Sequence, residues 1–215
     1  MTAVDRLTGV LEEFVEKARL ERVMLGDMLA AIGDGGYGFI CLLISLPFLI
    51  PVSLGPISTA AGAAFLILGW QMIRGRQSPW LPQRIAALTL GPRQVELMLG
   101  ACRRVLRWCR KISRPRLESW VEGRRGLAFA GWLIVLGGIL IAVPLPGLPL
   151  TNTIPALSII FACVALLERD GLMLLFALFW LIVTLVYFAV IGWILYFVGM
   201  QAFEWLKDYL PSWLL

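Results

Sequence analysis

The chain has 215 residues, of which 60% are hydrophobic and only 15% are charged, with a formal net charge of +5. Soluble domains carry about 45–50% apolar and about 25% charged residues, so this composition excludes an ordinary soluble globule and a disordered chain. We therefore expect an all-α integral membrane protein in which residues 1–215 form a single membrane domain.

Residues 1–34 are expected to form one amphipathic helix, which carries seven acidic and four basic residues. Its apolar residues recur at spacings of three and four, a pattern that Glu21 interrupts once. The apolar stripe lies on the membrane or on the protein's own body; pairing between protomers is the alternative. The stripe consists of Val4, Leu7, Leu11, Phe14, Ala18, Leu25, Met28 and Ile32.

Residues 35–73 contain no charge and form the first of two apolar stretches that prolines interrupt. Pro47, Pro51 and Pro56 divide it into two arms of about 16 residues, each about 24 Å long as a helix. The hydrocarbon core is about 30 Å thick, so neither arm crosses it alone. We expect a re-entrant helical hairpin with its turn at membrane depth. Two thin, tilted spans with an exposed turn are the alternative.

Residues 74–125 form a basic segment with thirteen basic and three acidic residues. Such an excess beside apolar spans marks the cytoplasmic side and suits contact with anionic lipid head groups. A second amphipathic helix is expected over roughly 92–112, starting at Pro92. Nucleic-acid binding is not expected, because membrane segments bound the basic segment on both sides.

Residues 126–167 form the second uncharged stretch, with expected arms over 126–143 and 155–167. Its interruption is as rich in proline as the first. Residues 171–203 contain neither charge nor proline, and they are expected to form one long transmembrane helix. The prolines of the second turn are Pro144, Pro146, Pro149 and Pro155.

The two interrupted stretches resemble each other and indicate a weak internal repeat, with an amphipathic helix ahead of each copy. Pro47 precedes Gly75 by 28 residues, and Pro144 precedes Gly171 by 27. Proline- and glycine-interrupted segments at corresponding positions of two halves point to a transporter's binding site. A chance likeness of composition is the alternative. The spacing leaves open whether the repeats are parallel or inverted.

Several motifs together resemble the bacterial ExoD family of exopolysaccharide-synthesis membrane proteins, over about residues 5–200. The resemblance implies a bacterial inner-membrane protein linked to exopolysaccharide production, and it brings no known reaction or catalytic residue. The motifs are Gly33-Asp34-Gly35-Gly36-Tyr37-Gly38-Phe39, Leu46-Pro47-Phe48-Leu49-Ile50-Pro51, Gln71-Met72-Ile73-Arg74-Gly75-Arg76, Pro79-Trp80-Leu81-Pro82, Asn152 with Pro155, and Leu167-Glu168-Arg169-Asp170-Gly171-Leu172.

Polar groups beside the apolar stretches are the candidate site, since ionisable residues next to membrane segments are functional candidates. We expect the charged ones at the mouth of a cavity between the hairpins, with Asp34 and Arg169 paired. Asn152, together with serine and threonine hydroxyls, is expected at its depth. Alternatively, Asp34 caps a turn and residues 168–170 form a solvated loop. The candidates are Asp34, Arg74, Asn152, Glu168, Arg169 and Asp170.

The sequence favours a protein that is not an enzyme. It contains no histidine, which removes Ser-His and Cys-His catalysis and histidine-bound zinc. No cofactor or metal is expected. We expect a small transporter or flux-coupling protein of the inner membrane, a homodimer with residues 74–125 in the cytoplasm. A non-catalytic scaffold that organises polysaccharide-synthesis machinery is the alternative.

Overall fold

The chain divides into two compact units, residues Met1–Leu181 and Ile182–Leu215. The description comes from a computed structural model. Within these units the structure describes residues 3–21, 23–32, 35–50, 55–76, 78–87, 89–97, 99–100, 104, 118–121, 123–143, 145 and 148–207.

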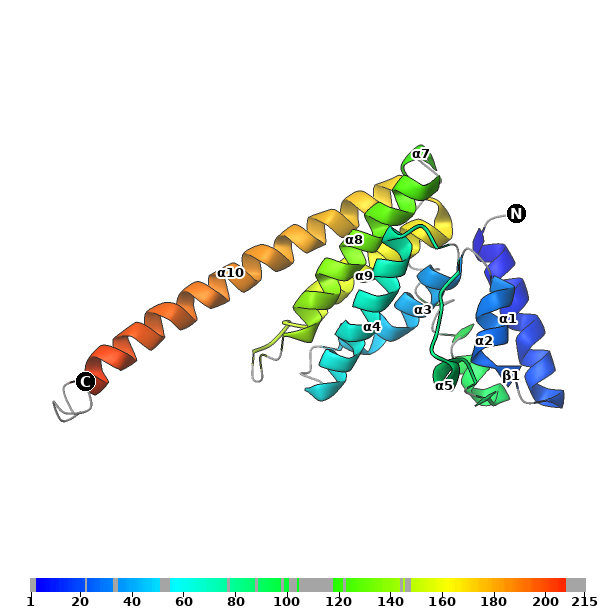
Figure 1. Ribbon diagram of the computed structural model, residues 1–215, viewed down its shortest axis with the longest axis horizontal. Helices are drawn as coiled ribbons and strands as arrows, with labels where there is room; N and C mark the ends of the chain where they lie inside the picture. The colour runs from blue at the N-terminus through cyan, green and yellow to red at the C-terminus, as the bar shows by residue number, and fades with distance from the viewer. Residues whose placement is uncertain are drawn as a thin grey trace. The chain divides into compact units, whose positions relative to one another are not determined.

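Two helical hairpins form the centre of the first unit (Figure 1). The first consists of α3 (Gly36–Ser45), the 3-10 turn η2 (Leu46–Leu49) and α4 (Pro56–Ile73). The second consists of α8 (Gly123–Ala142) and α9 (Thr153–Glu168). Both hairpins turn at the same end of the bundle, where Thr59 at the start of α4 contacts the last residue of α8. The expected non-helical break between the arms is present in each hairpin.

Glycines hold α4 against α8. Gly62 faces the backbone oxygen of Gly138, and Gly69 faces that of Gly131, so a Cβ at either α4 glycine would lie 2.7 Å from a carbonyl oxygen. Both pairs are seven residues apart on their helix, which is two turns, and they meet in antiparallel order. Small residues at these four positions let the two backbones approach closely, as is common in membrane helix pairs.

Helix α9 lies at the middle of the bundle, and most of its residues are buried. It packs against α8 on one side and α3 on another, where Gly38 of α3 faces the Cys163 carbonyl. The first turns of α10 (Gly171–Lys207) complete this core. There the Ser158 hydroxyl donates to the Ala177 carbonyl at 2.8 Å, and the rings of Phe161 and Phe176 stack at 5.8 Å.

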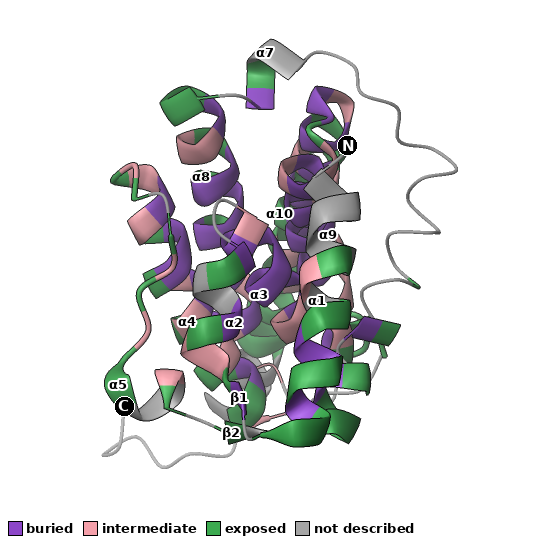
Figure 2. Cartoon of the chain, turned by 90° about the vertical axis from the view of Figure 1, so that its right-hand side faces the viewer, coloured by how far each residue is buried: buried purple, intermediate pink, exposed green. Residues whose placement is uncertain are grey.

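The amino-terminal region differs from the single helix expected over residues 1–34. It forms α1 (Ala3–Leu20), the two-residue strand β1 (Val23–Met24) and α2 (Leu25–Ile32). The helix ends where Glu21 breaks the apolar spacing, and β1 pairs antiparallel with β2 (Thr89–Leu90). Buried and exposed positions alternate around α1 (Figure 2), and its buried side chains join the core, so the stripe packs on the protein's own body.

The basic segment is described in part. It contains α5 (Gln83–Ala86), β2, a helical stretch over 92–97 and α7 (Glu118–Val121). Most of the amphipathic helix expected over 92–112 lies outside the described residues. Its described part fits the expectation, since Val95 is buried while Arg93 and Glu96 are exposed.

Three helices among the described residues are long and apolar enough to cross a membrane: α4, α8 and residues Gly171–Gln201 of α10. The expected long helix over 171–203 is therefore present. Residues 185–201 of α10, in the second unit, are largely exposed apolar side chains that suit lipid as a solvent. The chain is a helical membrane protein.

Candidate functional site

A cavity of about 710 Å³ lies where the turns of the two hairpins meet. Both hairpins contribute, and none of the described residues that line it is charged. Its walls combine small and apolar side chains with four polar ones. The lining residues are Gly55, Pro56, Ser58, Thr59, Ala60, Ala63, Val143, Leu145, Thr151 and Asn152.

The hydroxyl groups that line the cavity donate hydrogen bonds to backbone carbonyls. Ser58 Oγ donates to the Gly55 carbonyl at 2.6 Å, and Thr151 Oγ1 donates to that of Leu148 at 3.2 Å. Thr59 Oγ1 reaches the Ala142 carbonyl at 3.4 Å and links the first hairpin to the second. A hydroxyl that donates its proton still has oxygen lone pairs, so these three groups can accept hydrogen bonds from a ligand.

Asn152 differs from the hydroxyls because its amide makes no hydrogen bond with the described residues. It directly precedes α9, is only 6% exposed and does not cap the helix. Its amide nitrogen and oxygen are not among the buried unpartnered atoms of the described residues, so both keep access to the cavity and its solvent. The next residue has a similar shortage, since Thr153 Oγ1 is buried with no hydrogen-bond partner among the described residues. Among the described residues, the start of α9 therefore contains one buried hydroxyl without a partner.

Both α4 and α9 begin at this cavity. Gly55 and Asn152, the residues that precede the two helices, line it, and neither helix start is capped by a side chain. Neither first turn contains an acidic residue. The first backbone N–H groups of a helix lack intrahelical partners and carry partial positive charge. Here most of these donors are used or missing. Pro56 and Pro155 have no N–H, the Ser58 N–H donates to the Gly55 carbonyl at 3.0 Å, and the Ile154 N–H donates to the Leu150 carbonyl at 3.1 Å.

The charged candidates lie at the opposite end of the hairpins. Arg74 directly follows α4, and Glu168 is the last residue of α9. Helix α9 has 16 residues, so about 24 Å separate its two ends. The charged residues therefore do not line the cavity that contains Asn152. Asp34 lies outside the described residues, and its pairing with Arg169 stays a prediction.

The turn prolines are placed in part. Pro47 lies in η2, Pro56 opens α4, and Pro155 lies in the first turn of α9. Pro149 lies in the non-helical turn between α8 and α9, as expected. The remaining three, Pro51, Pro144 and Pro146, lie outside the described residues.

Two of the charged candidates, Arg169 and Asp170, stabilise helix ends. Arg169 follows α9 with φ 54° and ψ 40°, the left-handed conformation that commonly ends a helix. Asp170 is fully buried, and its Oδ1 accepts a hydrogen bond of 2.9 Å from the Leu172 N–H at the start of α10. The guanidinium of Arg74 lies 5.2 Å from the ring centre of Trp70. Arg169 and Asp170 thus connect α9 to α10 at the charged end.

The comparisons with known proteins identify the family of this chain. A family model described as "Exopolysaccharide synthesis, ExoD" matches residues 7–190. The chain is 34% identical to Protein ExoD of Rhizobium meliloti over 195 residues, which cover 91% of this chain and 79% of that protein. The chain belongs to the ExoD family. It is also 29% identical over 168 residues to an uncharacterized protein of Synechocystis, with 78% of each chain covered. No solved structure matches it.

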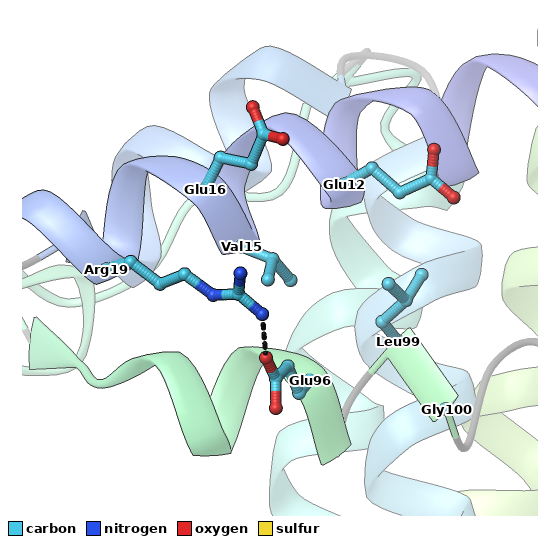
Figure 3. A pocket seen from close by; sticks show the side chains of 7 residues that line it. All are labelled: Glu12, Val15, Glu16, Arg19, Glu96, Leu99 and Gly100. Atoms are coloured by element: carbon cyan, nitrogen blue, oxygen red, sulfur yellow. Dashed lines mark hydrogen bonds and ion pairs between the residues drawn. The ribbon is translucent and has the colours of Figure 1, made fainter.

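A second hollow of this ExoD-family protein, of about 420 Å³, lies between α1 and residues 96–100 (Figure 3). Val15 and Leu99 are buried there, and Arg19 forms an ion pair of 2.9 Å with Glu96. The Glu16 carboxylate points away from that pair. Because the paired side chains are 64% and 47% exposed, the hollow is a solvated seam that holds α1 on the body.

The sequence predicts the polar residues of the turns, but it does not predict that α4 and α9 both begin at one cavity. Pro56 at a first helical position was the available signal, because proline favours that position. The partners of the α4 glycines were also not apparent, since Gly131 and Gly138 lie about 70 residues away in the sequence. The match in their seven-residue spacing is the signal that could have paired them.

Proposed function

We propose that this ExoD-family protein is a small transporter or flux-coupling protein of the bacterial inner membrane, and not an enzyme. Its site is the cavity between the hairpin turns. One observation carries the proposal: the turn end is polar inside and apolar outside. Ser58, Thr151 and Asn152 are buried, whereas Ile57 is 62% and Ile50 60% exposed. A turn in water would favour the reverse arrangement.

In this proposal the hairpins are re-entrant, so the turns lie inside the bilayer. Neither uncharged stretch, 35–73 or 126–167, provides a charged residue that would hold its turn in water. Helix α9 has 16 residues and reaches only about 24 Å, short of the roughly 30 Å core. Helices α4 and α8 are long enough to cross, and a tilt accommodates them when the turns lie at depth.

The proposal includes a parallel internal repeat. The first helix of each hairpin packs on the second helix of the other, which is the exchange that a twofold axis along the hairpins produces. Gly38 of α3 faces α9, and Gly138 of α8 faces α4. Both turns lie at one end, which supports a parallel rather than an inverted arrangement.

The orientation places residues 74–125 in the cytoplasm, because this segment carries the largest excess of positive charge. Six of its arginines are exposed and suit contact with anionic lipid head groups: Arg74, Arg76, Arg93, Arg104, Arg124 and Arg125. Both hairpins then enter and leave on the cytoplasmic side, and α10 crosses the membrane. A homodimer is part of the proposal, and chemical cross-linking in membranes tests it.

The second candidate function is a non-catalytic scaffold for polysaccharide-synthesis machinery. The exposure of the basic residues favours it, since Arg74, Arg76, Arg124 and Arg125 all offer charge to a partner. A scaffold needs this basic face and has no use for an open cavity between the turns.

A bulky residue in the cavity separates the two functions. Ala63 lines the cavity, and we expect Ala63→Trp to reduce exopolysaccharide output severely in cells that depend on this protein. Ile67→Trp is the matched control, because Ile67 is an exposed α4 residue outside the cavity lining. Both variants are first checked for equal abundance in the membrane. Full output from Ala63→Trp, with loss of output when the four arginines become glutamine, would favour the scaffold.

A further inference from the structure

We infer that the charged end of the α4–α8 pair holds a binding site for one anionic phospholipid. The inference deepens the proposed function and rests on it, since it needs the hairpins in a bilayer with this end at the membrane surface. The head-group part of the site consists of four exposed arginines, and none of them forms an ion pair with a described residue. These are Arg74, Arg76, Arg124 and Arg125.

The end of α4 fixes the backbone between two of these arginines. Gly75 has φ 77°, a left-handed conformation that favours glycine. Its N–H donates to the Met72 carbonyl at 2.9 Å. The Arg76 N–H donates to the Gln71 carbonyl at 3.1 Å, and the two hydrogen bonds together form the Schellman motif that ends many helices. Arg74 and Arg76 therefore flank one glycine in a defined turn.

Arg124 of the second hairpin lies over that glycine. A Cβ at position 75 would lie 3.0 Å from Arg124 Nε and 3.4 Å from its Cδ, so glycine leaves the space that this side chain occupies. Arg125 is the next residue in the first turn of α8. Arginines from both hairpins thus come together at one place, where several guanidinium groups can donate hydrogen bonds to the same phosphate.

The exposed side chains along α4 follow the order of the groups in a phospholipid. Arg74 follows the last turn, but its guanidinium lies 5.2 Å from the ring centre of Trp70, one turn back along the helix. Trp70 is 49% exposed, and Ile67, on the same face, is 52% exposed. Cation, indole and aliphatic side chain therefore succeed one another as phosphate, glycerol ester and acyl chain do. Tryptophan is the residue that favours the level of the ester groups.

Helix α8 repeats this order from its own charged end. Trp132 directly follows Gly131, and Trp70 directly follows Gly69, the two glycines that contact each other in the antiparallel pair. In antiparallel helices, the residues that follow two facing positions turn toward the same side, so both indoles flank the α4–α8 contact on one side. The exposed α8 residues, at spacings of three and four, are Arg125, Phe129, Trp132 and Leu136.

This order favours a lipid over a protein partner or a free phosphate. A partner in the aqueous phase would meet cations that point away from the membrane, whereas the Arg74 guanidinium turns back along α4. A free phosphate would use the arginines and leave the exposed indoles and aliphatic side chains without a contact. An excess of arginines favours an anionic head group over a zwitterionic one.

The test is native mass spectrometry of the purified full-length protein, which resolves individual bound lipids. The probes are dioleoyl phosphatidylglycerol and dioleoyl phosphatidylcholine. We expect one phosphatidylglycerol to bind about tenfold more tightly than phosphatidylcholine. Arg124→Gln together with Arg125→Gln should weaken its binding about tenfold or more, as the loss of charge-assisted hydrogen bonds implies. The matched control is Arg93→Gln with Arg104→Gln, which removes the same charge from exposed positions outside the site and should leave the affinity nearly unchanged.

Equal losses in the two double variants would overturn the inference, because the charge of the whole segment would then attract the lipid. Equal affinity for the two lipids would also overturn it, and would leave the four arginines to the partner of a scaffold. Inorganic phosphate at the concentration of the lipid should not displace it, and displacement would contradict a lipid site. Ala63 lies at the turn end, so Ala63→Trp should keep the lipid bound, and failure of either test leaves the other result standing.

Discussion

The two ends of the hairpins differ in which side chains they bury and which they expose. At the turn end, polar groups are buried and apolar side chains face outward. At the other end, Arg74, Arg76, Arg124 and Arg125 are exposed, while the buried Asp170 caps a helix. The contrast teaches that exposed charges gather at one end of the hairpins, whereas the other end buries polar groups behind exposed apolar side chains, which is the arrangement that the proposed re-entrant hairpins need. The packed middle of α4, α8 and α9 separates them.

The largest effect is expected from breaking the middle of the bundle. In Gly62→Ala the new Cβ would lie 2.6 Å from the Cβ of Ala142 and 2.7 Å from the Gly138 carbonyl oxygen. Overpacking of this kind costs about 1–3 kcal/mol, and thermal unfolding in detergent should report it. Gly192→Ala is the control, since a Cβ there meets nothing within 4 Å. Equal stability of the two variants would mean that the glycine contacts do not join the hairpins.

A smaller loss is expected at the charged end from Asp170→Ala. This change removes the hydrogen bond from the Leu172 N–H, and loss of such a cap costs about 1 kcal/mol. Asp170→Ser should keep most of the stability, because serine also caps helix starts. If Asp170→Ser lost exopolysaccharide output while remaining folded, the carboxylate would have a functional role that its cap does not explain.

Substitutions of Arg169 separate two effects at the charged end: the effect of its left-handed backbone on stability and the effect of its charge on function. Its φ of 54° suits glycine, so Arg169→Gly should stabilise the fold slightly or leave it unchanged, whereas Arg169→Val should cost about 1 kcal/mol. Denaturant unfolding compares the two. Exopolysaccharide output from Arg169→Gln then tests the charge, and its loss would support the pairing with Asp34.

The smallest effect is expected at the seam of α1. A double-mutant cycle with Arg19→Met and Glu96→Gln should give a coupling of about 0.2–1 kcal/mol, because both side chains are largely exposed. High salt should reduce it further. A coupling of several kcal/mol would show that this seam is a functional contact and not a solvated one.

The arms of the hairpins were predictable because prolines and charges mark their limits, as at Pro56 and Glu168. The start of α8 at Gly123 was not, since its first turn includes Arg124 and Arg125, which lie outside the apolar stretch. The break after Leu20 was marked only by Glu21, and no periodic pattern reveals that Val23 pairs with Leu90.

The polar turn residues of the candidate site were predictable by type and place. Their separation from the charged residues was expected as well, because the charges border the apolar stretches whereas the prolines interrupt the middle of each stretch. The length of α9 decides it, by placing Asn152 and Glu168 at opposite ends of one helix.

The depth of the turns tests the central claim most directly. In a variant without the four native cysteines, a single cysteine replaces either Ile57 at the turn end or Ser78 at the charged end, and a spin label is attached in lipid vesicles. The account predicts that the label at 57 collides with oxygen and is shielded from a water-soluble nickel complex, while the label at 78 is reached by nickel. Ready access of nickel to the label at 57 would place the turn in water and contradict the account.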